Sequence, residues 1–148
     1  MTNVRNSYRE TVVRGATPVR LVILLYEQVI DDLRRATKAV EDNDTENRTN
    51  AINHAILIIG HLENKLNHQA GKEVAGNLER FYDMSRRKLL EAQVQRSKPT
   101  IDEQISFYLE LREAWLQVER DERAHFFTAV STATEDDAED RRRTDWKG

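Results

Sequence analysis

The fold class is decided by one stretch, TPVRLVILLYEQVIDDLRRATKAVE, residues 17–41. Thr17 can cap the free N–H groups at a helix start, and Pro18 is tolerated at the first helical position. Apolar residues then recur at helical spacing, so the stretch predicts a helix over 18–41. These apolar residues cover an arc of about 200° on a helical wheel, which is wider than one seam between helices needs.

Two more helices are expected after a short turn. Asp44 can cap a helix over about 45–69, and Gly71 is placed to end it in the left-handed conformation. A third helix is then expected over about 72–96. The three predicted helices are therefore joined by short connections.

A fourth helix begins after a proline. Pro99 ends the preceding helix, and Thr100 with Glu103, three residues later, forms a capping box. The apolar spacing predicts a helix from 101 to about 119, which extends toward 130.

Each later helix carries one apolar seam that we expect in the core. The seams are Ile52, Ala55, Ile56, Ile59, Leu62 and Leu66; Val74, Leu78, Phe81, Ser85, Leu89 and Ala92; and Ile101, Ile105, Tyr108, Leu111, Trp115 and Val118. The sequence therefore predicts an all-α fold, an antiparallel up-down four-helix bundle over 17–119. An irregular N-terminal segment, 1–16, precedes it. A charged tail, 120–148, follows it and is expected to be a helix extension that becomes disordered.

Composition excludes several classes of protein. With 5 Gly and 2 Pro, the chain has too few turn formers for an all-β fold, and with 0 Cys it cannot form disulfides or thiolate sites. The net charge of -3 gives no general attraction to nucleic acid. The longest apolar runs, 21–26 and 55–59, fall far short of the roughly 20 residues of a membrane span. Because the N-terminus has no apolar signal region, we expect a cytoplasmic protein.

The candidate chemical groups favour neither an enzyme nor a metal site. His54, His61 and His68 recur every seven residues, which separates neighbours on a helix by about 10 Å, too far to share one metal ion. We interpret them as a solvated face, and the adjacent Asp31 and Asp32 as ordinary surface charge. No phosphate-binding or nucleophile motif occurs, so we expect no catalytic site, no cofactor and no metal.

Some apolar residues are left over after the bundle is closed. Ile23, Tyr26 and Ile30 lie at one edge of the wide arc on the first helix. Later helices carry apolar residues outside their seams, namely Leu57, Leu90 and Val94. Two explanations stay open: loops, the N-terminal segment or a neighbouring helix cover these residues, or they form a groove for a partner helix.

Six phrases occur in a characteristic order over about residues 6–119: NSY (6–8), GATPVRLV (15–22), LLYE (24–27), GKEVAGNL (71–78), FYDMSRR (81–87) and LREAW (111–115). This order and spacing resembles the FliS family of flagellar secretion chaperones. The family pattern has Ser where Thr17 stands, which keeps the capping chemistry. It has Gly-Gly-Glu where this chain has Gly71-Lys72-Glu73, and Leu in place of Phe81.

The resemblance implies a cytoplasmic export chaperone. Such a protein binds the disordered C-terminal segment of flagellin, prevents premature polymerisation and keeps flagellin competent for flagellar type III secretion. Other flagellar export or regulatory proteins are further partners, and the segment before the first helix, with Tyr8, serves as a removable cover. The residues expected to bind flagellin are Tyr8, Leu21, Val22, Ile23, Leu25, Tyr26, Ile30, Leu57, Leu90 and Val94.

Two other functions remain open from the sequence. One is a helical adaptor bundle that binds another folded protein through the face of the 18–41 helix. The other, which has less support, is a metal-binding bundle enzyme. Co-purification with flagellin distinguishes the chaperone, and metal analysis tests the enzyme.

Overall fold

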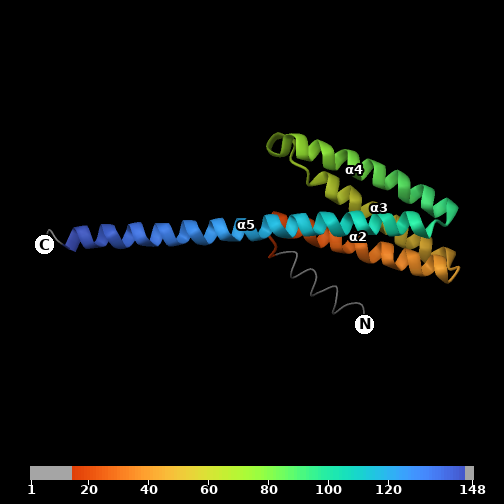
Figure 1. Ribbon diagram of the computed structural model, residues 1–148, viewed down its shortest axis with the longest axis horizontal. Coiled ribbons are helices and arrows are strands. Elements are labelled where there is room, and N and C mark those ends of the chain that lie inside the picture. Colours follow the sequence, from red (N-terminus) through yellow and green to blue (C-terminus); the bar gives the residue numbers. More distant parts are fainter. Residues whose placement is uncertain (1–14, 146–148) are drawn as a thin grey trace. The chain divides into compact units, whose positions relative to one another are not determined.

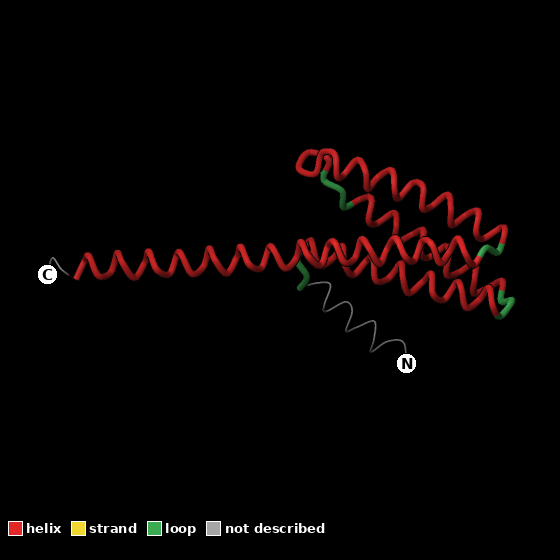
Figure 2. The backbone as a smooth tube through the Cα atoms, in the orientation of Figure 1, coloured by secondary structure: helices red, strands yellow, loops and turns green. Residues whose placement is uncertain are grey.

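A computed structural model of the chain describes residues 15–145, with side chains at positions 15–125, 128 and 129 (Figure 1). This part contains four helices and no strand, which confirms the all-α prediction (Figure 2). The helices are α2 (Pro18–Glu41), α3 (Thr45–Asn64), α4 (His68–Gln95) and α5 (Lys98–Asp145). The chain divides into two compact units, Met1–Trp115 and Leu116–Gly148. The first unit holds α2, α3, α4 and the beginning of α5.

The start of α2 follows from its capping chemistry. The Thr17 hydroxyl accepts a hydrogen bond of 3.2 Å from the backbone N–H of Arg20, and Pro18 occupies the first turn. Asp44 does the same for α3, where its carboxylate accepts a 3.1 Å hydrogen bond from the N–H of Asn47. The predicted bounds of α2, 18–41, agree with the structure, as does the start of α3.

The connection between α3 and α4 differs from the prediction. Helix α3 ends at Asn64 instead of 69, and α4 begins at His68, because Asn67 caps it with a 3.1 Å hydrogen bond from the N–H of Ala70. The left-handed position predicted at Gly71 was wrong. Among the described glycines none has a positive φ, and Lys72 instead adopts φ 44° and kinks α4.

Helix α5 begins three residues before the predicted start. The helix starts at Lys98, with Pro99 in the first turn, where a missing N–H costs nothing. The Ser97 hydroxyl accepts a 3.4 Å hydrogen bond from the N–H of Thr100, so Thr100 lies inside the helix and the predicted capping box at its start was wrong. The helix continues to Asp145. That residues 120–148 become disordered stays a prediction.

Pairs of side chains show how the helices of the first unit run. Glu27 meets Arg112 and Glu41 meets Lys98, so α2 and α5 are antiparallel neighbours. Helices α4 and α5 are antiparallel as well, because Ser85 pairs with Gln104 and, four residues earlier on α4, Phe81 packs on Tyr108.

The core lies between all four helices of this unit. Most predicted seam residues are buried or pack against it, including Ile52, Ile59, Leu89, Ile101 and Tyr108. Two predicted seam residues were placed wrongly, because Val74 and Val118 are exposed. At Val74 the buried neighbour is Ala75, whose small side chain occupies the packed position.

Candidate partner-binding surface

The edge of α2 that was predicted to be exposed is buried. Ile23 and Tyr26 are 0% exposed and Ile30 is 4% exposed, so the prediction that these three residues border an open groove was wrong. The reason is that α2 contacts three helices, α3, α4 and α5. The Tyr26 hydroxyl lies 2.7 Å from that of Tyr82 on α4, and its ring packs on Tyr108 of α5 at 6.1 Å between centroids. Part of the wide apolar arc on α2, including Tyr26 and Ile30, therefore packs in the core of the bundle.

The other predicted residues on α2 are neither fully buried nor fully exposed. Leu21, Val22 and Leu25 are partly buried, and Val22 and Leu25 pack against the core. Tyr8 lies outside the described residues.

Three predicted residues on α3 and α4 are exposed. Leu57 is 58%, Leu90 52% and Val94 85% exposed, and we call them the α3–α4 patch. Arg86 of α4 pairs with Glu63 of α3, which fixes the register of the two helices. In an antiparallel pair, position 57, six residues before Glu63, is then level with position 92, six residues after Arg86. Leu57 therefore lies at the level of Leu90 and Val94.

An apolar groove between α4 and α5 was not predicted. It has a volume of about 400 Å³ and is lined by Val74, Asn77, Leu78 and Phe81 of α4 and by Phe107, Glu110 and Leu111 of α5. The sequence placed Val74, Leu78 and Phe81 in the core, and Phe107 was not singled out. Phe107 could have indicated the groove, because it is a large apolar residue outside the predicted seam of its helix.

Tyrosine hydroxyls deep in the bundle keep the walls of this groove in place. The Tyr108 hydroxyl donates to the Ser85 hydroxyl at 2.8 Å, and Ser85 donates to the side-chain oxygen of Gln104 at 2.7 Å. Burial raises the pKa of Tyr26, Tyr82 and Tyr108 above that of an ordinary phenol. These phenols are therefore neutral, and their hydrogen bonds join α2, α4 and α5.

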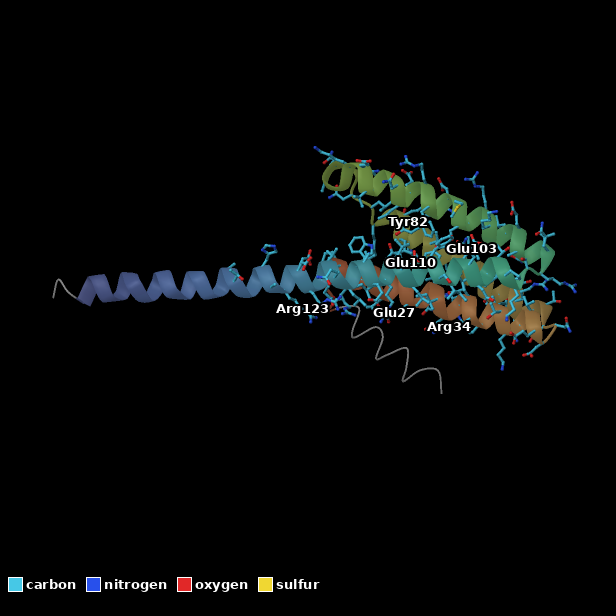
Figure 3. The ribbon with its side chains drawn as sticks, viewed as in Figure 1. Glu27, Arg34, Tyr82, Glu103, Glu110 and Arg123 are labelled. Atoms are coloured by element: carbon cyan, nitrogen blue, oxygen red, sulfur yellow. The ribbon has the colours of Figure 1, made fainter. Side chains whose placement is uncertain are left out.

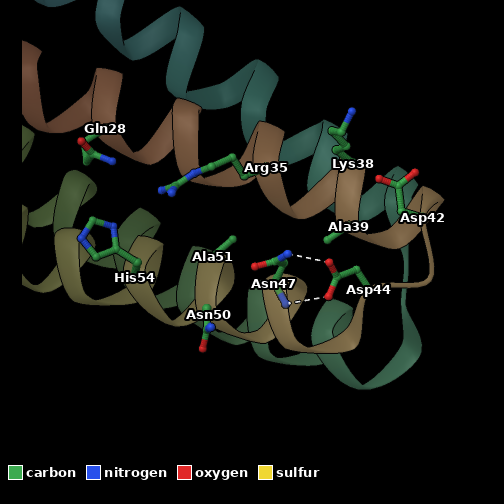
Figure 4. A pocket seen from close by; sticks show the side chains of 10 residues that line it. All are labelled: Gln28, Arg35, Lys38, Ala39, Asp42, Asp44, Asn47, Asn50, Ala51 and His54. Carbon is green, nitrogen blue, oxygen red and sulfur yellow. Dashed lines mark hydrogen bonds between the residues drawn. The ribbon is translucent and has the colours of Figure 1, made fainter. Parts of the chain in front are cut away.

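A buried carboxylate joins α2 to α3. Asp32 is 0% exposed, so interpreting it as surface charge was wrong. It accepts hydrogen bonds from the side-chain amide of Gln28 at 3.0 Å and from Arg35, and its other oxygen lies 2.6 Å from Nδ1 of His54. Gln28, Arg35 and His54 also line a polar pocket of about 700 Å³ between the two helices (Figure 4).

The three histidines of the predicted solvated face have different surroundings. His54 is half-exposed and bonded to Asp32, while His68 lies 3.7 Å from Glu79 and His61 is exposed. Within the described residues, no three His, Cys, Asp or Glu side chains gather as metal ligands. No helix in the same part of the chain is long and apolar enough to cross a bilayer.

Comparison with known proteins identifies the family. Residues 1–122 match the family described as Flagellar protein FliS, which is most of the chain. The chain belongs to the FliS family. It is 34% identical over 106 residues to the flagellar secretion chaperone FliSB of Pseudomonas aeruginosa, which covers 72% of this chain and 84% of that protein.

Two further FliS-family relatives are named flagellar secretion chaperone FliS. The protein of Bacillus subtilis is 28% identical over 121 residues, which covers 82% of this chain and 90% of the relative. That of Salmonella typhimurium is 32% identical over 110 residues, which covers 74% and 82%. The FliS match contains both the α3–α4 patch and the α4–α5 groove and ends in the second unit.

Proposed function

We propose that this FliS-family chain is a cytoplasmic flagellar export chaperone that binds the disordered C-terminal segment of flagellin. By holding that segment it prevents premature polymerisation and keeps flagellin competent for type III secretion. The observation that carries the proposal is the α3–α4 patch, where Leu57, Leu90 and Val94 expose large apolar side chains on a bundle of this family.

Simple physics explains why such a patch suits this client. A segment that folds only inside a filament exposes apolar residues when it is free, and it can bury them as a helix against apolar side chains of a bundle. Ordering a disordered segment costs several kcal/mol, which only a substantial apolar contact offsets. Isolated apolar residues are normal on protein surfaces, so the proposal depends on Leu57, Leu90 and Val94 acting together.

The structure weakens the adaptor alternative. That function required an accessible face on α2, but Ile23, Tyr26 and Ile30 are buried. The family relatives carry chaperone names, and we expect neither catalysis nor a bound metal.

The test is a calorimetric titration of the full chain with a synthetic C-terminal segment of the host's flagellin. Leu90→Asp and Val94→Asp together should weaken binding at least tenfold, which is about 1.4 kcal/mol, and leave the helical circular dichroism unchanged. Leu109→Asp is the matched control, because Leu109 is an exposed leucine (37%) on α5, outside the α3–α4 patch. Failure of the unmodified chain to bind the segment would refute the proposal.

A further inference from the structure

Arg48 of α3 is a buried cation without a partner in the described part of the chain. Only 7% of the residue is exposed. Its Nε is buried and has no hydrogen-bond acceptor, and among the described residues no carboxylate lies within ion-pair distance of its guanidinium. Arginine is almost never buried to this extent unless it is paired, because a charge taken out of water must be compensated.

The guanidinium occupies a core position of α3. Arg48 precedes Ile52 by four residues and Ala55 by seven, and both of these are 0% exposed, so Arg48 continues their buried face by one turn. A side chain that served packing alone would be apolar here, as Ile52 and Ala55 are. The charge at this position is therefore the feature that packing does not explain.

Two connections between helices close the end of the bundle where Arg48 lies. Arg48 is in the first turn of α3, which begins at Thr45. Glu41 at the end of α2 lies 3.0 Å from Nζ of Lys98 at the start of α5, so the α2–α3 and α4–α5 connections meet at this end. Side chains on a helix lean toward its N-terminus, so the guanidinium of Arg48 is directed toward these connections.

The carboxylates at this end do not neutralise the guanidinium. They are Glu41, Asp42, Asp44 and Asp102. Asp44 caps α3 through a 3.1 Å hydrogen bond from the N–H of Asn47. Glu41 pairs with Lys98, and Asp102 lies 3.9 Å from the same ammonium. The remaining one, Asp42, is exposed. Compensation from within this group would break an existing contact or bury a solvated carboxylate.

We infer that Arg48 binds an oxyanion, a carboxylate or phosphate group, at the end of the bundle that the connections 42–44 and 96–97 close. A water molecule could accept the hydrogen bond of Nε, but it would leave the charge uncompensated. An oxyanion does both, because the planar guanidinium can donate two parallel hydrogen bonds to two oxygens of one group. This inference does not rest on the proposed function.

The experiment follows thermal melting of the full chain at pH 7 in sodium phosphate, sodium acetate and sodium chloride at equal ionic strength. At about ten times its dissociation constant, a bound oxyanion should raise the melting temperature by about 3–6 °C relative to chloride. A rise in phosphate alone identifies the ligand as a phosphate group, and a rise in acetate identifies it as a carboxylate. Either result supports the inference.

A neutral variant tests whether Arg48 carries the response. Arg48→Met keeps a stem of similar length without the charge, so it should abolish the rise in either salt. In chloride it should melt no lower than the unmodified chain, because it removes an unpaired buried charge. Arg34→Met is the matched control and should keep the full response, since Arg34 is an exposed arginine on α2 (Figure 3).

Equal melting temperatures of the unmodified chain in the three salts, up to the highest concentration, would overturn the inference, whether or not the variant folds. Melting of Arg48→Met more than about 2 °C below the unmodified chain in chloride would also overturn it, because Arg48 would then have a partner within the chain. An equal loss of the response in Arg34→Met would assign the effect to general surface charge and overturn it as well.

Discussion

Leu89 and Leu90 are adjacent on α4 but have opposite surroundings, and exchanging each for alanine gives a sharp test. Leu89 is 0% exposed in the core, whereas Leu90 is 52% exposed in the α3–α4 patch. Leu89→Ala removes buried methyl groups and leaves a cavity, which costs about 2–5 kcal/mol. Leu90→Ala removes a half-exposed side chain and should change the free energy of unfolding by no more than about 0.5 kcal/mol.

The assay is urea denaturation and thermal melting of both variants. For a chain of this size, 1 kcal/mol shifts the melting temperature by about 2–4 °C, so Leu89→Ala should lower it by roughly 4–20 °C. Leu90→Ala should melt within about 2 °C of the unmodified protein and yet bind flagellin more weakly. Equal destabilisation by the two variants would show that the rotational setting of α4 is wrong, and with it the α3–α4 patch.

Three other substitutions or conditions test the interior. Ile23→Asp should unfold the bundle, because an unpaired buried charge costs several kcal/mol, and retained helical circular dichroism would contradict its burial. Asp32→Ala should lower the free energy of unfolding by about 1–3 kcal/mol in urea melts through loss of its contacts with Gln28 and His54, whereas a neutral result would mean that the carboxylate is solvated. Because burial raises the pKa of Tyr82 above the roughly 10 of an unfolded tyrosine, the folded state keeps more protons above that pH. Stability should therefore be fully present below about pH 10 and fall as pH rises beyond it, and Tyr82→Phe should reduce the slope; a flat profile would contradict the buried phenol.

The ends of the helices were predictable where short-range chemistry determines them. Thr17 and Asp44 cap α2 and α3 as their side chains predict. At α5, Ser97 caps earlier than Thr100, the residue chosen from the sequence, and at α4 the cap is Asn67, where the sequence had indicated no candidate. Several polar residues in each of these turns can cap a helix. The pattern alone does not distinguish among such neighbours.

The burial of single side chains was harder to predict, because it depends on long-range contacts. In the sequence, Asp32 resembles an ordinary surface charge. In the fold it pairs with His54, which is 22 positions away in the chain. Val74 and Ala75 are adjacent in the sequence and about 100° apart on the helical wheel. Apolarity favoured Val74 as the seam residue, whereas the structure buries Ala75. The wide arc of α2 indicated correctly that this helix has extra neighbours. For Tyr26 these neighbours are α4 and α5, which contact it through Tyr82 and Tyr108.

The most direct test of the central claim is a flagellin polymerisation assay followed by light scattering. An equimolar amount of the purified chain should suppress filament growth from monomeric flagellin, and the chain carrying Leu90→Asp and Val94→Asp should suppress it much less. Filament growth that is unaffected by the unmodified chain at several-fold excess would contradict the account.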